Sequence, residues 1–271
     1  MNNGEGGVER STWAQGWKGI RLLVAGIGVM LSGPLLAGAY EEVPIPQGAS
    51  LVGTVKFSGT RPESLRYNVK MGSNPEYCKI RADEKGDVVV PQVQVSAAHE
   101  LAEVVVFLQE VEKGKALPPE GPKVEVDLCR FAPHVTTGVM GQSLRVGSQD
   151  SILHQVRGWE YMGKNRLPTF MASNLKAGAE QAVPLQVKRS GILQLTCDQH
   201  RFMEGWVLVT ANPYATVTDQ QGRFSLTDIP PGTHTLGAWH PVLGYQEAKV
   251  TVTAGHQTSV TLTMTPATAQ K

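Results

Sequence analysis

Short runs that alternate between apolar and polar residues dominate the chain from residue 50 onward. A period of two residues places one face of each run in a core and predicts half-buried β-strands. Turns rich in Gly, Pro and Asp separate the runs, and no stretch has the period of a long amphipathic helix. The runs expected to form strands are residues 50–58, 87–95, 103–108, 123–128, 143–146, 182–187, 191–196 and 206–210, followed by a cleaner series from residue 215. We therefore predict an all-β chain built from β-sandwiches.

Composition narrows the class of protein. Hydrophobic residues make up 41% of the 271 residues and charged residues 18%, so the chain can build a core and wholesale disorder is excluded. The formal net charge is +1, and no basic surplus indicates a nucleic-acid partner. Residues 141–145 lack the second glycine of a nucleophile elbow, and the sequence contains no Cys-x-x-Cys. We expect no enzymatic activity.

Residues 1–39 have the pattern of a secretory signal peptide. Arg10, Lys18 and Arg21 precede the apolar run 22–36, which ends in the Ala-x-Ala pattern closed by Ala39. Glycines, a serine and a proline interrupt the run, which is short for a bilayer span of about 20 residues. An uncleaved anchor is the alternative. We expect cleavage after Ala39, a periplasmic or otherwise exported protein, and no membrane span in the mature chain.

One loop carries three metal-ligating residue types. Residues 197–203 place Cys197, His200 and Met203 at a C-x2-H-x2-M spacing, between the predicted strands 191–196 and 206–210. Thiolate, imidazole and thioether groups together suit a soft or borderline metal, and a second imidazole would complete the set. His154, just after the predicted strand 143–146, is the candidate. A buried core thiol with ordinary loop residues is the alternative, and zinc is disfavoured because a thioether binds it poorly.

This loop resembles that of the type 1 blue copper proteins, the cupredoxins, with the short spacing of amicyanin. The upstream runs 131–135, 139–146 and 150–154 are similar to the cupredoxin approach to its first ligand, so the resemblance covers about residues 122–210. It implies a Greek-key sandwich and one type 1 copper bound by four side chains, which are His154, Cys197, His200 and Met203. Gln155 and Asp198 depart from the usual Asn and Ser or Thr, which puts the bracing of the ligand loops in doubt.

The C-terminal part resembles a different family. Residues 218–226 and 229–236 are similar to the T-D-x-x-G-x-F and P-P-G-x-Y-x-L motifs of the carboxypeptidase regulatory-like, transthyretin-like sandwich. This resemblance covers residues 212–267, but the first two strands of such a module are missing there. Matching strand types lie upstream within residues 48–111. We therefore expect strands 50–58 and 103–108 to pair with strands after residue 215, with the cupredoxin-like part inserted between them.

The remaining cysteines, Cys78 and Cys129, are expected to form a disulfide, because export exposes the chain to an oxidising compartment. The bridge would close a loop of about 50 residues, which a chain-entropy estimate values at roughly 4 kcal/mol. Two buried thiols, or a second metal site with His134, remain the alternatives.

The two resemblances together imply an exported one-electron carrier, similar to the exported proteins often labelled methylamine utilisation proteins. A redox protein, either a periplasmic dehydrogenase or a c-type cytochrome, would be its partner. His200, expected on an exposed loop, would be the exit for the electron. The alternative is a non-redox module that binds copper or docks a protein or polymer.

Overall fold

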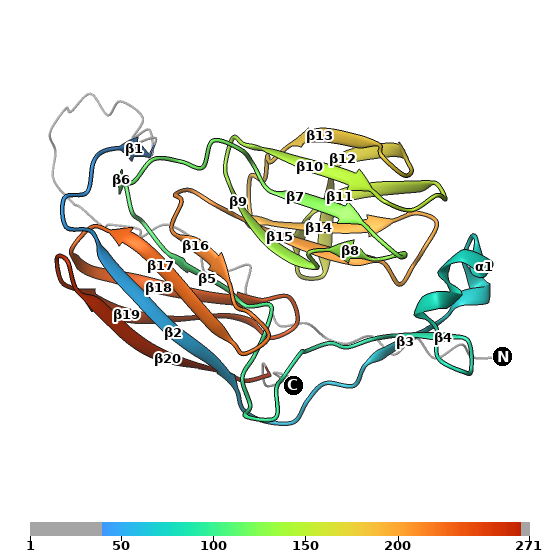
Figure 1. Cartoon of the computed structure of the whole chain (residues 1–271), viewed down its shortest axis with the longest axis horizontal. Coiled ribbons are helices and arrows are strands. Elements are labelled where there is room, and N and C mark those ends of the chain that lie inside the picture. The colour runs from blue at the N-terminus through green and yellow to red at the C-terminus, as the bar shows by residue number, and fades with distance from the viewer. Residues whose placement is uncertain (1–39, 267–271) are drawn as a thin grey trace, which may run out of the picture.

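The computed structural model describes residues 40–266, so the predicted signal peptide lies outside the described residues. Within them the chain is all-β, as predicted, and forms two sandwiches of two sheets each (Figure 1). None of the helices within residues 40–266 is long and apolar enough to cross a membrane. We call the sandwich of residues 123–210 the inserted sandwich, and the one built from strands on both sides of it the host sandwich.

The inserted sandwich has one sheet in the order β13-β10-β7-β8 and a second in the order β12-β11-β14-β15-β9. Apolar side chains from both sheets, such as Leu144, Val146, Leu193 and Leu195, are almost fully buried between them. The strands are β7 Lys123–Val126, β8 Phe131–Ala132, β9 Val135–Val139, β10 Ser143–Ser148, β11 His154–Met162, β12 Asn165–Leu175, β13 Glu180–Pro184, β14 Ile192–Cys197 and β15 Glu204–Thr210.

The hairpin of β11 and β12 was not among the predicted strands. β11 alternates between buried and partly exposed residues, and a turn at Gly163, with φ of 73°, leads into β12. β12 is a sheet-edge strand whose first residues are exposed and include Pro168, and only Ala172 and Leu175 near its end are buried, so its sequence shows no continuous alternation. The hairpin matters for function because β11 begins at His154.

The host sandwich confirms the strand pairing expected across the insertion. Its sheets have the orders β16-β5-β18-β19 and β17-β2-β20, so the two upstream strands β2 and β5 lie inside sheets of C-terminal strands. A separate short pair is formed by β1 (Glu41–Glu42), which precedes β2, and β6 (Lys113–Gly114), which follows β5. The host strands are β2 Ala49–Phe57, β5 Val105–Leu108, β16 Ala215–Val217, β17 Arg223–Ile229, β18 Gly232–His240, β19 Gly244–Val252 and β20 Gln257–Met264.

Residues 58–100 leave the host sandwich, and their middle part, with Val69, Cys78 and Val88, lies against the inserted one before Val93 returns to the host core. We call residues 58–100 the strap. Both of its ends are fixed to β2, because Phe57 N donates to His99 O at 2.7 Å and Leu101 N donates to Val55 O at 2.8 Å. Figure 1 shows it running from β2 to the far end of the inserted sandwich, where α1 lies. Its elements are β3 Leu65–Asn68, η2 Val69–Met71, α1 Pro75–Cys78, η3 Lys79–Arg81 and β4 Asp87–Val90.

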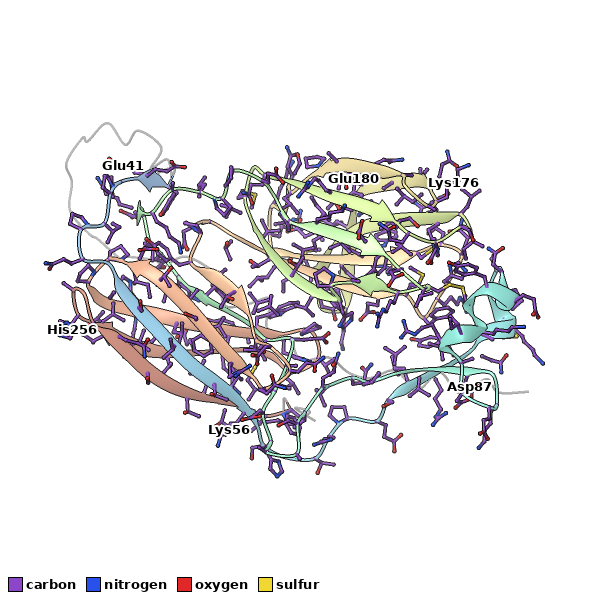
Figure 2. The ribbon with its side chains drawn as sticks, viewed as in Figure 1. Glu41, Lys56, Asp87, Lys176, Glu180 and His256 are labelled. Carbon is purple, nitrogen blue, oxygen red and sulfur yellow. A yellow bond between two sulfur atoms is a disulfide. The ribbon has the colours of Figure 1, made fainter. Side chains whose placement is uncertain are left out.

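The strap corrects one predicted strand of the upstream region and shows where the rest of that region lies. The strand predicted over residues 87–95 ends at Val90, because Pro91 follows and cannot donate a ladder hydrogen bond. The region 48–111 does not belong as a whole to the host sandwich, since Val69, Cys78 and Val88 are buried in the core of the inserted sandwich. In Figure 2 the labelled Lys56 and Asp87 mark how far the chain travels between β2 and this core.

The two sandwiches meet through aromatic rings and one ion pair. Trp206 of β15 contacts Trp239 of β18 edge to face, with ring centroids 6.0 Å apart. Beside them, His134 Nδ1 lies 2.8 Å from a carboxylate oxygen of Glu103. Burial alone lowers the pKa of His134, but the hydrogen bond to Glu103 and the charges of Glu103 and Glu204 outweigh burial and raise it. His240, the neighbouring imidazole, is neutral because burial lowers its pKa to about 4.

The ion pair between the sandwiches predicts a pH-dependent stability. A raised folded-state pKa means that His134 stabilises the fold below its unfolded-state pKa of about 6.5, and that this contribution is lost as the pH rises through the folded value. We expect the advantage of the wild type over His134→Gln to fall by about 0.5–1 kcal/mol between about pH 5.5 and about pH 9. Urea unfolding at both pH values measures it. Glu103→Gln should remove the same pH-dependent part, and a wild-type advantage that grows with pH would contradict the assignment.

Candidate metal centre

Strand register brings His154 and Cys197 to the same face of one sheet. Val156 of β11 is the partner of Cys197 at the end of β14. Side chains of paired residues point to the same face, and so do those of residues two apart on a strand. His154, Val156 and Cys197 therefore all point into the inserted sandwich, and all three are buried.

Two successive turns place the other candidate ligands. His200 N donates to Cys197 O at 3.3 Å, and Met203 N donates to His200 O at 3.0 Å. Each turn spans four residues and reverses the direction of the chain. Residues 197, 200 and 203 therefore lie at the same end of the sandwich. Met203 is 2% exposed and packs in the same apolar cluster as Cys197. The C-x2-H-x2-M spacing therefore matches the two turns, because each turn begins and ends at a candidate ligand.

The structure brings the three candidate strong ligands together. Cys197 Sγ lies 3.6 Å from His154 Nδ1 and 3.6 Å from His200 Nδ1. The three ligand atoms lie within 4.8 Å of one another, and the two imidazole rings have centroids 4.9 Å apart. One ion could contact all three atoms. Their role as metal ligands remains a prediction, as does that of Met203.

Asp150 fixes the orientation of His154. Its carboxylate is 1% exposed and lies 2.9 Å from His154 Nε2, which must donate to it. A proton on Nε2 leaves a lone pair on Nδ1, the nitrogen that faces Cys197. Asp150 also accepts hydrogen bonds from Leu128 N at 2.7 Å, Cys129 N at 2.8 Å and the Tyr77 hydroxyl at 3.2 Å. A buried carboxylate is tolerated there because donors surround it.

The strap covers His200, which corrects the expectation of an exposed ligand. His200 is 0% exposed, and its Nε2 donates to Ser73 O at 3.0 Å. Ser73 N in turn donates to Gln199 O at 3.2 Å, so one strap residue contacts the ligand loop through both backbone groups. The sequence could not show this, because the covering residue is 127 positions away. His200 is therefore no surface exit for an electron.

The two unusual neighbours of the ligands brace each other. Gln155 Nε2 donates to Asp198 Oδ2 at 2.7 Å, and Gln155 N donates to Gln199 Oε1 at 2.9 Å. Arg157 Nε donates to Asp198 as well, at 2.8 Å. β11 and the ligand loop are therefore braced in this protein too. The amide of Gln155 and the carboxylate of Asp198 do so in place of the usual Asn and Ser or Thr.

Burial keeps the three ligand groups uncharged in the metal-free protein. It raises the pKa of the Cys197 thiol, against the backbone hydrogen bonds at Gln155, Gln199 and His200. It lowers the pKa of His154, against the charge and hydrogen bond of Asp150, and that of His200, where the neighbouring His154 adds to the effect. Neutral imidazoles can bind a cation directly, whereas Cys197 must release its proton to do so.

The expected disulfide is present and lies beside the site. Cys78 of α1 and Cys129 are bonded, with Cα atoms 5.7 Å apart, and Cys197 is unpaired and buried. Their sulfur atoms and a ring nitrogen of His200 all lie within 4.8 Å of one another. Figure 2 shows the yellow sulfur–sulfur bond between α1 and the inserted sandwich. The alternative of a second metal site with His134 is wrong, since His134 pairs with Glu103 instead.

Sequence reasoning missed the residues around the ligands. Asp150 lies only four positions before His154, within the run 150–154, but the sequence did not mark its carboxylate as the partner of the imidazole. Tyr77 and Ser73 reach the site from positions distant in the sequence. No local pattern marks such a contact.

One known protein family matches the C-terminal part of the chain. A family model for the carboxypeptidase regulatory-like domain matches residues 206–265, which cover β15 and the C-terminal strands of the host sandwich. It agrees with the resemblance found in the sequence of residues 212–267. A search of curated proteins found no match.

Several solved structures are similar to about a third of the chain. A novel purple cupredoxin from Nitrosopumilus maritimus is 15% identical, with a TM-score of 0.28 over 33% of this chain and 99% of that one. A copper-containing nitrite reductase from Thermus scotoductus SA-01 is 20% identical, with a TM-score of 0.27 over 35% of this chain and 23% of that one. A reduced amicyanin with one tryptophan replaced by tyrosine is 17% identical, with a TM-score of 0.27 over 34% of this chain and 85% of that one.

The hydrogen bonds of Asp150 predict a stability effect that is independent of any metal. Asp150→Asn leaves one acceptor oxygen where two served four donors, and it turns an amide N–H toward the remaining donors. We expect the free energy of unfolding of the metal-free protein to fall by about 2–4 kcal/mol. Chemical denaturation measures it. Asp127→Asn is the matched control, since the ion pair of Asp127 with Arg130 is exposed and 3.9 Å long, and a change below about 0.5 kcal/mol is expected.

Proposed function

We propose that this protein is an exported copper protein that carries one electron. The observation that supports it most is the convergence of His154 Nδ1 and His200 Nδ1 on Cys197 Sγ, each at 3.6 Å, with Met203 on the same loop. A thiolate with two imidazoles and a thioether suits copper better than zinc, because the thioether is a soft ligand.

The side chains around the ligands fit this role. Asp150 and the Ser73 carbonyl each accept a hydrogen bond from the Nε2–H of one imidazole, so both Nδ1 lone pairs face Cys197. Bound copper would supply the one-electron step between its two common oxidation states. The chain holds the ligands between two strand ends and a loop braced by Gln155 and Asp198, so the ligands have little freedom to rearrange. Small rearrangement is what a carrier of single electrons needs.

Export and a redox partner complete the proposal. The sequence pattern of residues 1–39 and the Cys78–Cys129 disulfide both support an oxidising compartment outside the cytoplasm. The partner is proposed to be a dehydrogenase or a c-type cytochrome of that compartment. Because His200 is buried, the electron would cross the Ser73 carbonyl and the strap rather than leave from an exposed imidazole.

Storage or delivery of copper without electron transfer is a second candidate. The complete burial of both imidazoles favours it, since a buried ligand is far from a docking partner. Repeated reduction and oxidation of the copper-loaded protein by small redox reagents decides between the two. Reversible cycling with the copper retained supports the carrier, and release of copper on reduction supports storage or delivery.

The proposed thiolate ligand predicts a colour test. Addition of Cu(II) to the metal-free protein should give the strong visible band of blue copper proteins at one copper per chain. Cys197→Ser should abolish this band, because the thiolate supplies its charge-transfer transition, while far-UV circular dichroism stays unchanged. Absorption and copper analysis after gel filtration measure both quantities. A wild-type protein that binds Cu(II) without the band is not a type 1 copper protein.

The proposed axial ligand predicts a shift in reduction potential. Met203→Leu removes a weak soft ligand and keeps an apolar side chain of similar volume, so the visible band should persist and the potential should rise. Redox titration of both proteins measures the difference. Phe202→Leu changes a neighbouring buried side chain of the same loop and is the control, with a smaller shift expected. Equal shifts for both variants would remove Met203 from the ligand set.

A further inference from the structure

The strap contacts the metal centre at three separate points. Ser73 bonds to His200 and Gln199 through its backbone. The Tyr77 hydroxyl donates to Asp150, the residue that orients His154. One residue further along, the Cys78–Cys129 disulfide joins α1 covalently to the inserted sandwich. The segment therefore holds the outer side of both imidazole ligands.

The three candidate ligands are almost completely buried beneath and beside the strap. His154 and His200 are 0% exposed, and Cys197 is 5% exposed. Strap residues on either side of the contacts face outward, since Met71 is 86% exposed and Ile80 is 65% exposed. The strap is thus a thin layer, one short helix deep, between the centre and solvent. We expect a metal ion or a thiol reagent to reach Cys197 faster when this layer lifts, because the strap covers His200, which lies 3.6 Å from Cys197.

We propose that the strap is a lock on the metal centre and that the Cys78–Cys129 disulfide fastens it. With the bond in place, the far end of the strap stays at the site even when the hydrogen bonds of Ser73 and Tyr77 open. Local opening of this kind governs how fast a buried group reacts. The lock rests on the proposed function only for the exchange of copper; the shielding of Cys197 does not depend on which metal binds.

The metal-free full-length protein provides the first test. In the wild type and in the double variant Cys78→Ser/Cys129→Ser, Cys197 is the single free thiol, so its reaction with iodoacetamide can be compared directly. The rate in the folded protein, divided by the rate in the urea-unfolded chain, gives the protection of Cys197. We expect the double variant to lose at least tenfold of this protection. Protection equal to that of the wild type within about twofold would overturn the lock.

A second variant keeps the test decisive if the double variant does not fold. Tyr77→Phe retains the disulfide and removes only the hydroxyl that bonds to Asp150, so protection should fall by a smaller factor, about two- to fivefold. Glu76→Gln is the matched control on the same helix, because the Glu76 side chain is 86% exposed and pairs with Lys79 at the surface. No change is expected there. Protection in Tyr77→Phe that equals the protection in Glu76→Gln would argue against the lock.

Copper exchange separates the lock from the proposed function. Each protein is loaded with Cu(II) and then mixed with an excess of a chelator, and the release of copper is followed with time. We expect release from the double variant at least tenfold faster than from the wild type, at the same stoichiometry. If copper binds and colours both proteins but release and protection are equal, the lock fails and the proposed function stands. If Cys197 is protected only with the disulfide but no copper binds, the function fails and the lock stands.

Discussion

The four hydrogen bonds that converge on Asp150 connect the segments that build the candidate metal centre. One comes from the ligand candidate His154, two from the backbone of the loop that carries Cys129, and one from Tyr77 in the strap. A carboxylate without solvent needs such donors, and here they come from three different pieces of the chain. The ligand, the disulfide and the strap therefore share one charged group. A change that moves any of them changes the environment of the other two.

The ligand set itself depends on the backbone more than on this network. Cys197 ends one strand, His154 begins the neighbouring strand, and the pairing of Val156 with Cys197 sets their relative position. A shift of one residue in this register would turn His154 to the other face of the sheet. The two turns after Cys197 add His200 by the same local logic. The backbone hydrogen bonds of the inserted sandwich thus set the positions of the candidate ligands.

Local patterns were enough to predict most strands and the ligand loop, whereas the disulfide was inferred from the expected export and the pairing across the insertion from a family resemblance. The C-x2-H-x2-M spacing is written in seven consecutive residues, and alternation marked most strands, including β2 and β5 with their distant partners. The β11–β12 hairpin escaped notice because β12 lies at a sheet edge and has no continuous buried face. The strap escaped notice because its helices are three or four residues long, too short to show a period. Its burial of His200 depends on tertiary contact alone.

The interleaving of the two sandwiches has a consequence for the order in which the chain can fold. Ser50 of β2 pairs with Gln257 of β20, and Phe57 pairs with Met264. β2 can therefore complete its sheet only after almost the whole chain has been made. The inserted sandwich is complete at Thr210 and can close earlier, because contacts between distant residues form slowly. Both ends of the strap bond to β2, and its base is therefore anchored only when the host sandwich closes. We therefore expect a newly made chain to pass through a stage in which the candidate ligands are assembled while the base of the strap is not yet anchored.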